Sequence, residues 1–325
     1  MEKPKIAFMP CADQNAASTR IRVFFIAAAL RAQGFDVEIS RQPINADVLV
    51  IQKRIDRVTL QAARQTRESG GRVIYDLDDC GAALDWLGIE AEIERETLSL
   101  ADSLTVDTDE RLAFCAIDEK YKAIPHKAVV PDCIDYFPWL KQRDATRSFL
   151  RRTPVAVWFG NRVNFPPASA YLTEAVDRKY IKGADVFTNR DAISQLQARY
   201  PALDFHSWDL HNFPKALGNY DCSVLIHDSS IEGQLKSNNK MLVSLAAGVV
   251  PFVSDTPAYR QTAYDIGCSE LVVSNTGDLM DRLRSPDAIG NLRSSIISSR
   301  VEQYLQQRSP LSTAEKLIKF IEATS

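Results

Sequence analysis

Short apolar segments alternate with helical patterns along the first part of this chain. The apolar segments are IAFMP (6–10), FDVEI (35–39), DVLVI (47–51) and RVIYD (72–76), and helical periodicity covers 19–33 and 57–69. Strands that alternate with helices of this length are joined by right-handed crossovers and form a mostly parallel sheet. The pattern therefore predicts an α/β domain, with further strands near 103–106 and 127–131.

The alternation stops between Pro131 and Pro154 and then starts again. A basic run, KQRDATRSFLRR (141–152), fills most of the gap, and the apolar segment VAVWFG (155–160) opens the second block. A chain of 325 residues exceeds the size at which single cores usually stop growing, so two domains are expected. We predict two Rossmann-like domains, each a mostly parallel sheet flanked by helices.

The expected domain limits follow from this break. The first domain covers 1–140, a linker covers 141–153, and the second domain covers 154–308. The last segment, 309–325, carries apolar residues at helical spacing (Leu317, Ile318, Ile321). We expect it to form a helix that docks back on the first domain.

Composition excludes several classes of protein. The net charge is −3, whereas domains that bind nucleic acid through bulk charge are usually strongly basic. The six cysteines include no C-x-x-C pair, which gives no support for a disulfide framework or a zinc site. The sequence has no run of about 18 apolar residues, and the first apolar run is too short for a signal peptide. We expect a cytoplasmic protein with no nucleic-acid partner.

The segment DCSVLIHDSSIEGQLKSNNKMLVSLAAGVVPFVSD (221–255) combines two apolar strands, a polar loop and a small-residue helix. Lys236 and Lys240 are four residues apart, so both ammonium groups are expected on one side of a helix start, where free N–H groups favour anions. Ser237 is a good capping residue, and His227 ends the first strand. The segment predicts a phosphate or diphosphate site; the alternative is a solvated helix start.

Two linked Rossmann-like domains with a basic loop in the second resemble the GT-B fold of nucleotide-sugar glycosyltransferases. The similarity is to the bacterial retaining-type proteins called group 1 or family 4-like. It is carried by Lys236-Ser237-x-x-Lys240 leading into Ala246-Ala247-Gly248, and by the ASTRIRV segment (17–23). The resemblance implies a nucleotide-sugar as co-substrate, no other cofactor, and an acceptor that contacts Arg20 and Arg22.

The resemblance also implies a set of donor-binding residues. They are Asn161, Arg162, His227, Glu232, Lys236, Ser237 and Lys240. A solvated loop is the alternative reading for Arg162, and a surface position is the alternative for Glu232. Many relatives carry a ribose-binding glutamate where this chain has Val243, so one expected carboxylate is absent.

Asp76, Asp78 and Asp79 follow the apolar strand 72–74 and are expected at its carboxyl end. Packing like charges together raises at least one pKa, which suits a carboxylate for proton transfer. We predict a catalytic role for these three residues. The alternatives are a capped strand end and a divalent-cation site. Since GT-B relatives generally neutralise the leaving diphosphate with basic groups, we expect no essential metal.

The sequence thus predicts a glycosyltransferase of polysaccharide biosynthesis, with a glycan, lipid-linked or protein acceptor. The basic run at 141–152 is expected to be a solvated linker, and contact with an anionic membrane at the inner face is its alternative. One rival function is a catalytically silent GT-B subunit that binds a partner. Another is a nucleotide-sugar epimerase or hydrolase on the same fold.

Overall fold

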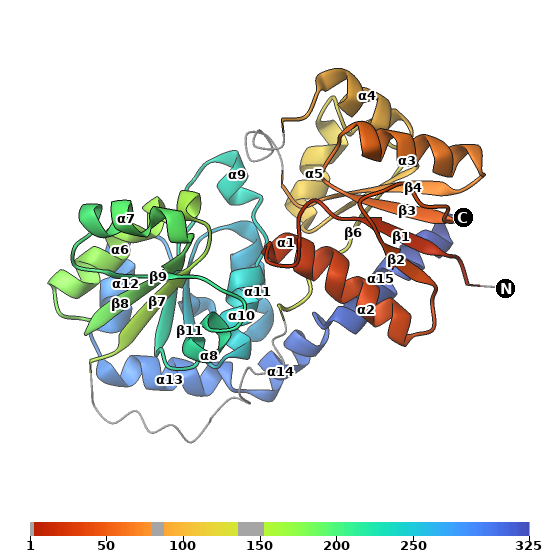
Figure 1. Ribbon diagram of the computed structural model, residues 1–325. Helices are drawn as coiled ribbons and strands as arrows, with labels where there is room; N and C mark the ends of the chain where they lie inside the picture. Colours follow the sequence, from red (N-terminus) through yellow and green to blue (C-terminus); the bar gives the residue numbers. More distant parts are fainter. Residues whose placement is uncertain (1–2, 80–87, 136–152, 325) are drawn as a thin grey trace. The chain divides into compact units, whose positions relative to one another are not determined.

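The chain forms two compact units (Figure 1). The computed structural model describes residues 3–79, 88–135 and 153–324. Unit 1 comprises Met1–Asp135, Leu235–Ser237 and Gln307–Ser325, and unit 2 comprises Tyr136–Gln234 and Asn238–Gln306. The predicted linker at 141–153 and its basic run lie outside the described residues, except for Thr153.

Unit 1 contains a parallel six-stranded sheet with the order β2-β1-β3-β4-β5-β6. Its strands are β1 (Ile6–Met9), β2 (Val37–Ile39), β3 (Val48–Gln52), β4 (Arg72–Leu77), β5 (Ser103–Val106) and β6 (His126–Val129). In the central register, Gln52 of β3 pairs with Asp76 of β4, and Asp76 pairs with Thr105 of β5. Since all strands run in one direction, their carboxyl ends meet at one edge of the sheet.

Alternate residues of these strands face opposite sides of the sheet. Leu49 and Tyr75 belong to one buried core, which α3 (Arg57–Glu68), α4 (Ala91–Ser99) and α5 (Asp109–Ile117) cover. Val48 and Ile74 belong to the other core, covered by two helices that lie side by side in Figure 1, α2 (Phe25–Ala32) and α15 (Pro310–Ala323). The period-2 pattern of the strands thus produces a three-layer unit.

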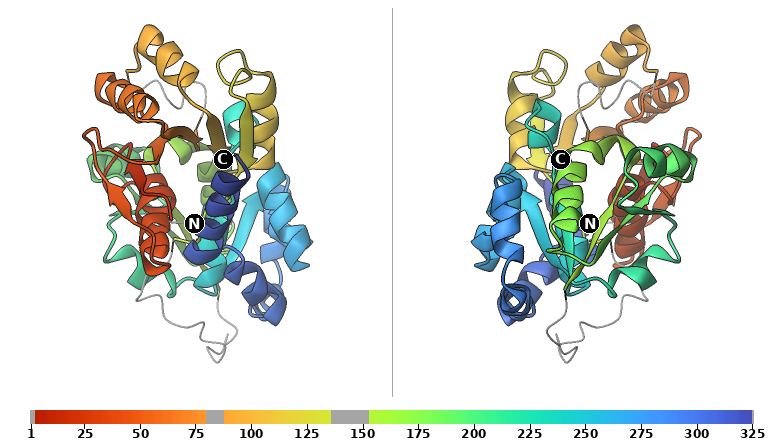
Figure 2. Two further views of the ribbon diagram at one scale, coloured as in Figure 1. Left: turned by 90° about the vertical axis from the view of Figure 1, so that its right-hand side faces the viewer. Right: turned by 90° about the vertical axis from the view of Figure 1, so that its left-hand side faces the viewer.

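The C-terminal helix α15 completes the second of these cores, so both chain termini belong to unit 1 (Figure 2). Ser309 caps the helix by accepting a hydrogen bond from the Ser312 N–H, and Pro310 stands at its first position. Ala314, Leu317, Ile318 and Ile321 are buried against the same core as Leu30 of α2. The last helix therefore docks back on the first sheet.

The expected helix at 19–33 has an irregular start. It consists of α1 (Ala17–Thr19), a π-helical turn η1 (Arg20–Phe24) and α2. The four consecutive residues from Arg20 to Val23 are all buried. A π turn is wider than an α turn and is often found at functional sites. It buries the two arginines together with two apolar residues.

Unit 2 contains a second parallel six-stranded sheet, with the order β12-β11-β10-β7-β8-β9. Its strands are β7 (Val155–Phe159), β8 (Gly183–Thr188), β9 (Asp204–Ser207), β10 (Cys222–Leu225), β11 (Val250–Ser254) and β12 (Val272–Val273). The central strands β10 and β11 are buried throughout, which explains their continuous apolar runs.

Helices flank this second sheet. They are α6 (Pro166–Asp177), α7 (Ile193–Arg199), α8 (Phe213–Leu217), α9 (Ile231–Gln234), α10 (Asn239–Ala246), α11 (Pro257–Ile266), α12 (Thr276–Leu283), α13 (Pro286–Ile296) and α14 (Ser299–Gln306). Short 3-10 turns follow β7, as η3 (Arg162–Asn164), and β8, as η4 (Arg190–Ala192), and a third, η5 (Ser269–Leu271), precedes β12. The predicted fold class, two parallel α/β domains of Rossmann type, is confirmed.

Candidate active site

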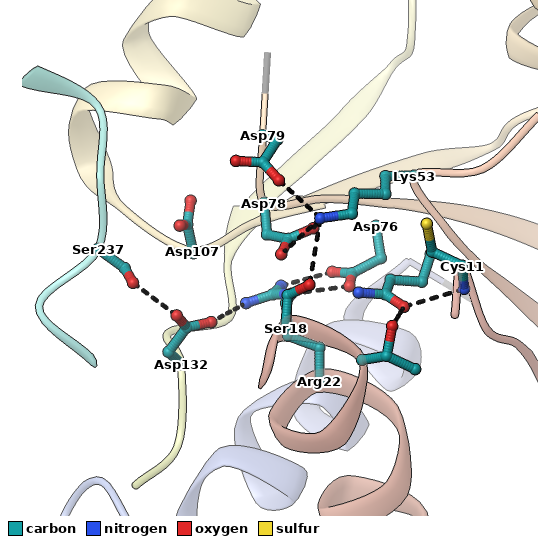
Figure 3. A network of polar contacts seen from close by, with 12 residues as sticks. Cys11, Ser18, Arg22, Lys53, Asp76, Asp78, Asp79, Asp107, Asp132 and Ser237 are labelled. Atoms are coloured by element: carbon teal, nitrogen blue, oxygen red, sulfur yellow. Dashed lines mark hydrogen bonds and ion pairs between the residues drawn. The ribbon is translucent and has the colours of Figure 1, made fainter. Parts of the chain in front are cut away.

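Charged side chains of unit 1 gather where its parallel strands end, at the edge where open α/β sheets bind ligands. We call them the charge network: Arg20, Arg22, Lys53, Asp76, Asp78, Asp79, Asp107, Arg111, Asp132, Asp135 and Lys236. Most of its members are shown in Figure 3. Every carboxylate in the network is paired with at least one cation.

Arg22 links two of the carboxylates. Its Nε donates to Asp76 Oδ2 at 2.8 Å, its Nη2 to Asp76 Oδ1 at 2.5 Å, and its Nη1 to Asp132 Oδ1 at 2.9 Å. Thr105 Oγ1 also donates to Asp76, at 2.6 Å. Burial alone would lower the pKa of Arg22, but the charge of Asp76 raises it well above its usual value. This guanidinium therefore stays charged and fixes both carboxylates.

Asp76 does not lie beyond its strand as the sequence predicted. β4 continues to Leu77, because the residues that flank Asp76 in the sheet, Gln52 and Thr105, are polar and Arg22 satisfies the carboxylate. Asp78 and Asp79 do follow the strand. Of the three predicted catalytic residues, Asp79 is the most exposed, with 20% of its side chain accessible.

Arg20 and Arg22 are both buried on the π turn. Arg20 Nε donates to Asp135 Oδ1 at 2.8 Å, and a second guanidinium nitrogen bonds the other oxygen of Asp135. Backbone carbonyls accept further bonds from these guanidinium groups, with Arg20 Nη1 donating to Gln14 O at 2.7 Å and Arg22 Nη1 to Val130 O at 3.0 Å. Their positions favour a role in tying the segment after β6 to the π turn and to β4, and their predicted contact with an acceptor stays a prediction.

Lys53 is a member of the network that the sequence did not single out. It stands directly after β3, in a left-handed conformation with φ of 39°, and its N–H donates to the Asp76 carbonyl at 2.8 Å. Its Nζ lies 2.6 Å from Asp79 Oδ2, 3.3 Å from Asp78 Oδ2 and 3.1 Å from Ser18 Oγ. Lys53 could have been predicted from its position, because it follows β3, the strand next to the one that carries the Asp76–Asp79 segment.

Asp79 bonds a second lysine. Lys236 Nζ donates to Asp79 Oδ1 at 2.8 Å, on the oxygen that Lys53 leaves open. Burial alone would raise the pKa of Asp79, but the charges of Lys53 and Lys236 outweigh it and lower that pKa to about 2. Three clustered carboxylates are expected to raise at least one pKa, but the pKa of Asp79 is not the raised one, since two lysines contact its carboxylate.

The neighbours of Lys236 also bond to residues near the carboxyl edge of the first sheet. Arg111 Nη2 donates to the Leu235 carbonyl at 2.8 Å. Ser237 Oγ donates to Asp132 Oδ2 at 2.6 Å, as Figure 3 shows. Arg111 is itself held by Asp107, at 2.5 Å from its Nε. Three consecutive residues, Leu235–Ser237, are thus each bound by a different residue near the sheet edge.

Asp107 follows β5 and is buried beside Arg111. Burial raises the pKa of its carboxyl to about 7, although Arg111 opposes the shift, and the nearby charge of Asp132 adds to it. A carboxyl with a pKa in this range titrates near neutral pH. Sequence reasoning did not single out this residue.

In unit 2, Lys240 is held at the carboxyl end of β7. Its Nζ lies 4.9 Å from the centroid of the buried Trp158 ring, a cation–π contact. Gly160 has φ of +150°, and a Cβ built there would lie 2.7 Å from Lys240 Nζ. Because Gly160 has no side chain, the Lys240 ammonium group can lie close to the backbone at the end of β7.

Lys236 and Lys240 do not share a helix face. Helix α10 begins at Asn239, so Lys236 precedes it and the expected i, i+4 relation does not apply. Lys236 bonds Asp79, whereas Lys240 lies over Trp158. The expectation that one helical turn relates the two lysines is wrong, since Leu235–Ser237 precede the helix and bond to Arg111, Asp79 and Asp132.

The other predicted donor-binding residues have separate positions in unit 2. The Arg162 N–H donates to Asn189 Oδ1 at 2.9 Å, and its exposed guanidinium lies 3.0 Å from Asp191. Asn161 caps the turn after β7 by accepting from the Val163 N–H. The His227 ring stacks on Tyr259 with Nε2 3.2 Å from the hydroxyl, and Glu232 lies on α9.

Val243 is buried in α10 and packs in the core of unit 2. Among the described residues, no group of three or more His, Cys, Asp or Glu side chains is arranged to hold a metal ion. None of the described helices has the length and apolar character that crossing a membrane requires.

No family model matches this sequence, and no curated protein matches it either. Solved structures resemble it in fold. The Anabaena protein HepE in complex with UDP is 10% identical, with a TM-score of 0.63 and coverage of 98% of this chain and 100% of HepE. A glycosyltransferase from Rickettsia africae is also 10% identical, with a TM-score of 0.63 and coverage of 100% and 99%.

A third similar structure is an alpha-glucosyltransferase in complex with UDP and a 13-mer DNA. It is 11% identical, with a TM-score of 0.63, and the match covers 99% of this chain and 100% of the enzyme. At such low identity the likeness concerns the fold alone. The two parallel six-stranded sheets and these matches over whole chains show that this protein has the GT-B fold of nucleotide-sugar glycosyltransferases.

Proposed function

We propose that this chain is a glycosyltransferase that moves a sugar from a nucleotide-sugar donor to a hydroxyl group of an acceptor. Two of the structures that share its fold are complexes with UDP, which supports a nucleoside diphosphate as the group to be bound. The observation that carries the proposal is Lys240, whose ammonium group lies against Gly160 and Trp158 where β7 ends.

The proposed role of Lys240 is to bind the donor's diphosphate. A nucleoside diphosphate leaving group gains negative charge as the sugar departs, and a fixed cation stabilises that charge. Lys236 and Arg162 would supply further positive charge, since both side chains retain access to solvent. We assign supporting donor contacts to Ser237, Asn161, His227 and Glu232, as the sequence predicts.

The acceptor is proposed to approach the charge network from Asp79. This carboxylate is more accessible than Asp76 and Asp78, and a carboxylate oxygen can accept a hydrogen bond from an acceptor hydroxyl. Asp76 and Asp78 would position the loop, and Arg20 and Arg22 would hold the carboxylates in place. Of the three predicted catalytic residues, this proposal keeps the catalytic role for Asp79, which is the most accessible.

We further propose that transfer needs no metal ion. The places between the carboxylates are filled by side-chain cations, with Lys53 bonded to Asp78 and Asp79, and Arg22 bonded to Asp76 and Asp132. A divalent ion would have to displace a bonded lysine or arginine. The test is to measure transfer in a chelator with and without added magnesium, and a strict magnesium requirement would contradict the proposal.

Nucleotide binding tests the donor site directly. We expect UDP, GDP or ADP to raise the melting temperature, since a ligand of the folded state stabilises it by mass action. Lys240→Ala should weaken that binding by about ten- to hundredfold, the value of a hydrogen bond to a charged group. Lys215→Ala, an exposed lysine of α8, is the matched control. Equal affinities for both variants would refute the donor site.

One rival function is a catalytically silent GT-B subunit that binds a partner. Val243 favours it, because the position expected to carry a ribose-binding carboxylate is an apolar core residue. A wild-type protein that shows no thermal shift with any nucleotide or nucleotide sugar would support this rival. Epimerase or hydrolase activity is separated from transfer by analysing the products formed with and without an acceptor.

The acceptor class is proposed to be a glycan, a lipid-linked saccharide or a protein, in a cytoplasmic pathway of polysaccharide biosynthesis. Contact with an anionic inner membrane would depend on the basic run at 141–152, which lies outside the described residues. Sedimentation with vesicles that contain anionic lipid tests this contact, and neutral vesicles are the control.

A further inference from the structure

We propose that Asp79 competes with the diphosphate of the donor for the ammonium group of Lys236. The inference rests on the proposed function, in which Lys236 is a diphosphate ligand. It adds that the chain itself supplies a competing anion. In the absence of donor, the Asp79 carboxylate of the charge network binds the lysine. Asp79 then acts as a positioning residue for Lys236.

The first support is the way in which Lys236 is held. Its two neighbours are bonded by other residues of unit 1: Arg111 Nη2 lies 2.8 Å from Leu235 O, and Asp132 Oδ2 lies 2.6 Å from Ser237 Oγ. Both anchors are buried. The backbone of the segment is therefore fixed, and the Lys236 side chain is the part that can change partner without moving it.

The second support is the difference between the two lysines of Asp79. The Lys53 side chain is 4% exposed, whereas that of Lys236 is 26% exposed. Lys53 bonds Ser18, Asp78 and Asp79, so it is fixed from three sides. Lys236 stands at the accessible margin of the network, and an incoming anion would meet it first.

The exchange has a consequence for Asp79. Lys53 and Lys236 together hold the pKa of Asp79 down, against the effect of burial. When the diphosphate takes Lys236, one of these two charges is neutralised and the carboxylate becomes more basic. It also regains a free oxygen, which is the form needed to accept a hydrogen bond from an acceptor hydroxyl.

The test is a double-mutant cycle on nucleotide affinity, measured by isothermal titration with UDP, and with GDP and ADP if UDP does not bind. Asp79→Asn keeps the side-chain shape and removes the charge that binds Lys236. We expect it to tighten nucleotide binding by about two- to fivefold, the range for partly exposed ion pairs. Structural damage would weaken binding instead.

The second arm of the cycle identifies Lys236 as the target. In a Lys236→Ala background, the effect of Asp79→Asn on affinity should disappear, because the group for which the two anions compete is gone. Asp78→Asn is the matched control, as Asp78 bonds Lys53 and lies beside Asp79 in sequence. It should change affinity less than Asp79→Asn does.

Two results would overturn this inference but leave the proposed function standing. One is a nucleotide affinity that Asp79→Asn does not change. The other is an equal gain in nucleotide affinity with and without Lys236, which indicates a general charge effect. Failure of the wild type and of every variant to bind any nucleotide would overturn the proposed function together with this inference.

Discussion

Lys240 carries its ammonium group over the face of the Trp158 ring, with Nζ 4.9 Å from the ring centroid. The ring is buried, so the contact is shielded from water on the side of the protein. A cation–π contact of this kind contributes about 0.5–2 kcal/mol, depending on how well it is desolvated. Trp158 is therefore expected to determine where the Lys240 charge lies.

We predict that Trp158→Phe lowers nucleotide affinity moderately and that Trp158→Leu lowers it further. Tryptophan gives the strongest cation–π contact, phenylalanine a weaker one and leucine none. Both changes also shrink the core, so melting temperature must be recorded beside the dissociation constant. A variant that loses stability while binding UDP like the wild type would show that the ring serves packing alone.

Gly160→Ala is predicted to weaken nucleotide binding as well. The new Cβ would lie 2.7 Å from Lys240 Nζ and 3.2 Å from the Trp158 ring, so the lysine must shift, and a φ of +150° strains any residue with a side chain. Strain of this kind costs about 1–3 kcal/mol. Gly183→Ala is the matched control, because its Cβ would meet no atom within 4 Å.

The outcome for Gly160→Ala is read from two measurements. Melting temperature reports the backbone strain, and titration with UDP reports the displacement of Lys240. Normal affinity in a folded Gly160→Ala protein would mean that the position of Lys240 beside Gly160 does not matter for binding.

Asp107 should give unit 1 an unusual pH dependence. Its folded pKa of about 7 lies above the usual aspartate value of 3.8, so between these pH values the folded state binds more protons than the unfolded state. The contribution of this group to the free energy of unfolding therefore falls as pH rises from about 4 to 7, and is constant above that range. Asp79 acts in the opposite direction, since its lowered pKa makes its contribution decrease as pH falls below about 4.

Asp107→Asn tests this by denaturant unfolding at several pH values. In the variant, we expect the free energy of unfolding no longer to decrease between pH 4 and 7. Its decrease below pH 4, to which Asp79 contributes, should remain. Asp107 faces Arg111, with Asp132 and Arg22 nearby, so Asp132→Asn serves to check whether a neighbouring carboxylate produces the same slope. An identical pH profile for wild type and Asp107→Asn would contradict the raised pKa.

Leu317→Ala should destabilise unit 1 by about 2–5 kcal/mol, the usual cost of truncating a buried leucine. Leu317 is 3% exposed in the core that α15 shares with α2, whereas Leu311 of the same helix is 48% exposed. Leu311→Ala is therefore the control and should cost well under 1 kcal/mol. Equal effects in thermal unfolding would mean that α15 is not part of the cooperative core.

The sheets could be predicted from the sequence because strands and helices are indicated by the pattern of apolar residues close together along the chain. The continuous apolar run Leu49, Val50 and Ile51 indicates a strand with two covered faces, and the spacing of Leu317, Ile318 and Ile321 indicates one apolar helix face. Such patterns depend on neighbours along the chain. The fold class, the place of helix 57–68 and the docking of the last helix follow from them.

The candidate site depends on contacts that no local pattern contains. Asp76 extends its strand because Arg22, 54 residues away, satisfies its carboxylate. Lys236 precedes its helix, and its segment is bound by Arg111 and Asp132. Asp79 has a lowered pKa because Lys53 and Lys236 flank it, and both lysines are too far away along the chain for a local pattern to pair them with Asp79. Local charge spacing therefore located the carboxylates but not the lysines that lower the pKa of Asp79.

Unit 1 combines segments that lie before and after most of unit 2 in the sequence. Its second core lacks Ala314, Leu317 and Ile321 until α15 is synthesised, so the apolar face of α2 and of the sheet beneath it stays uncovered while the intervening residues of unit 2 are made. Exposed apolar surface on a nascent chain invites aggregation and chaperone binding. On the ribosome, unit 2 is thus expected to fold first, and the domain that leaves the ribosome earliest matures latest.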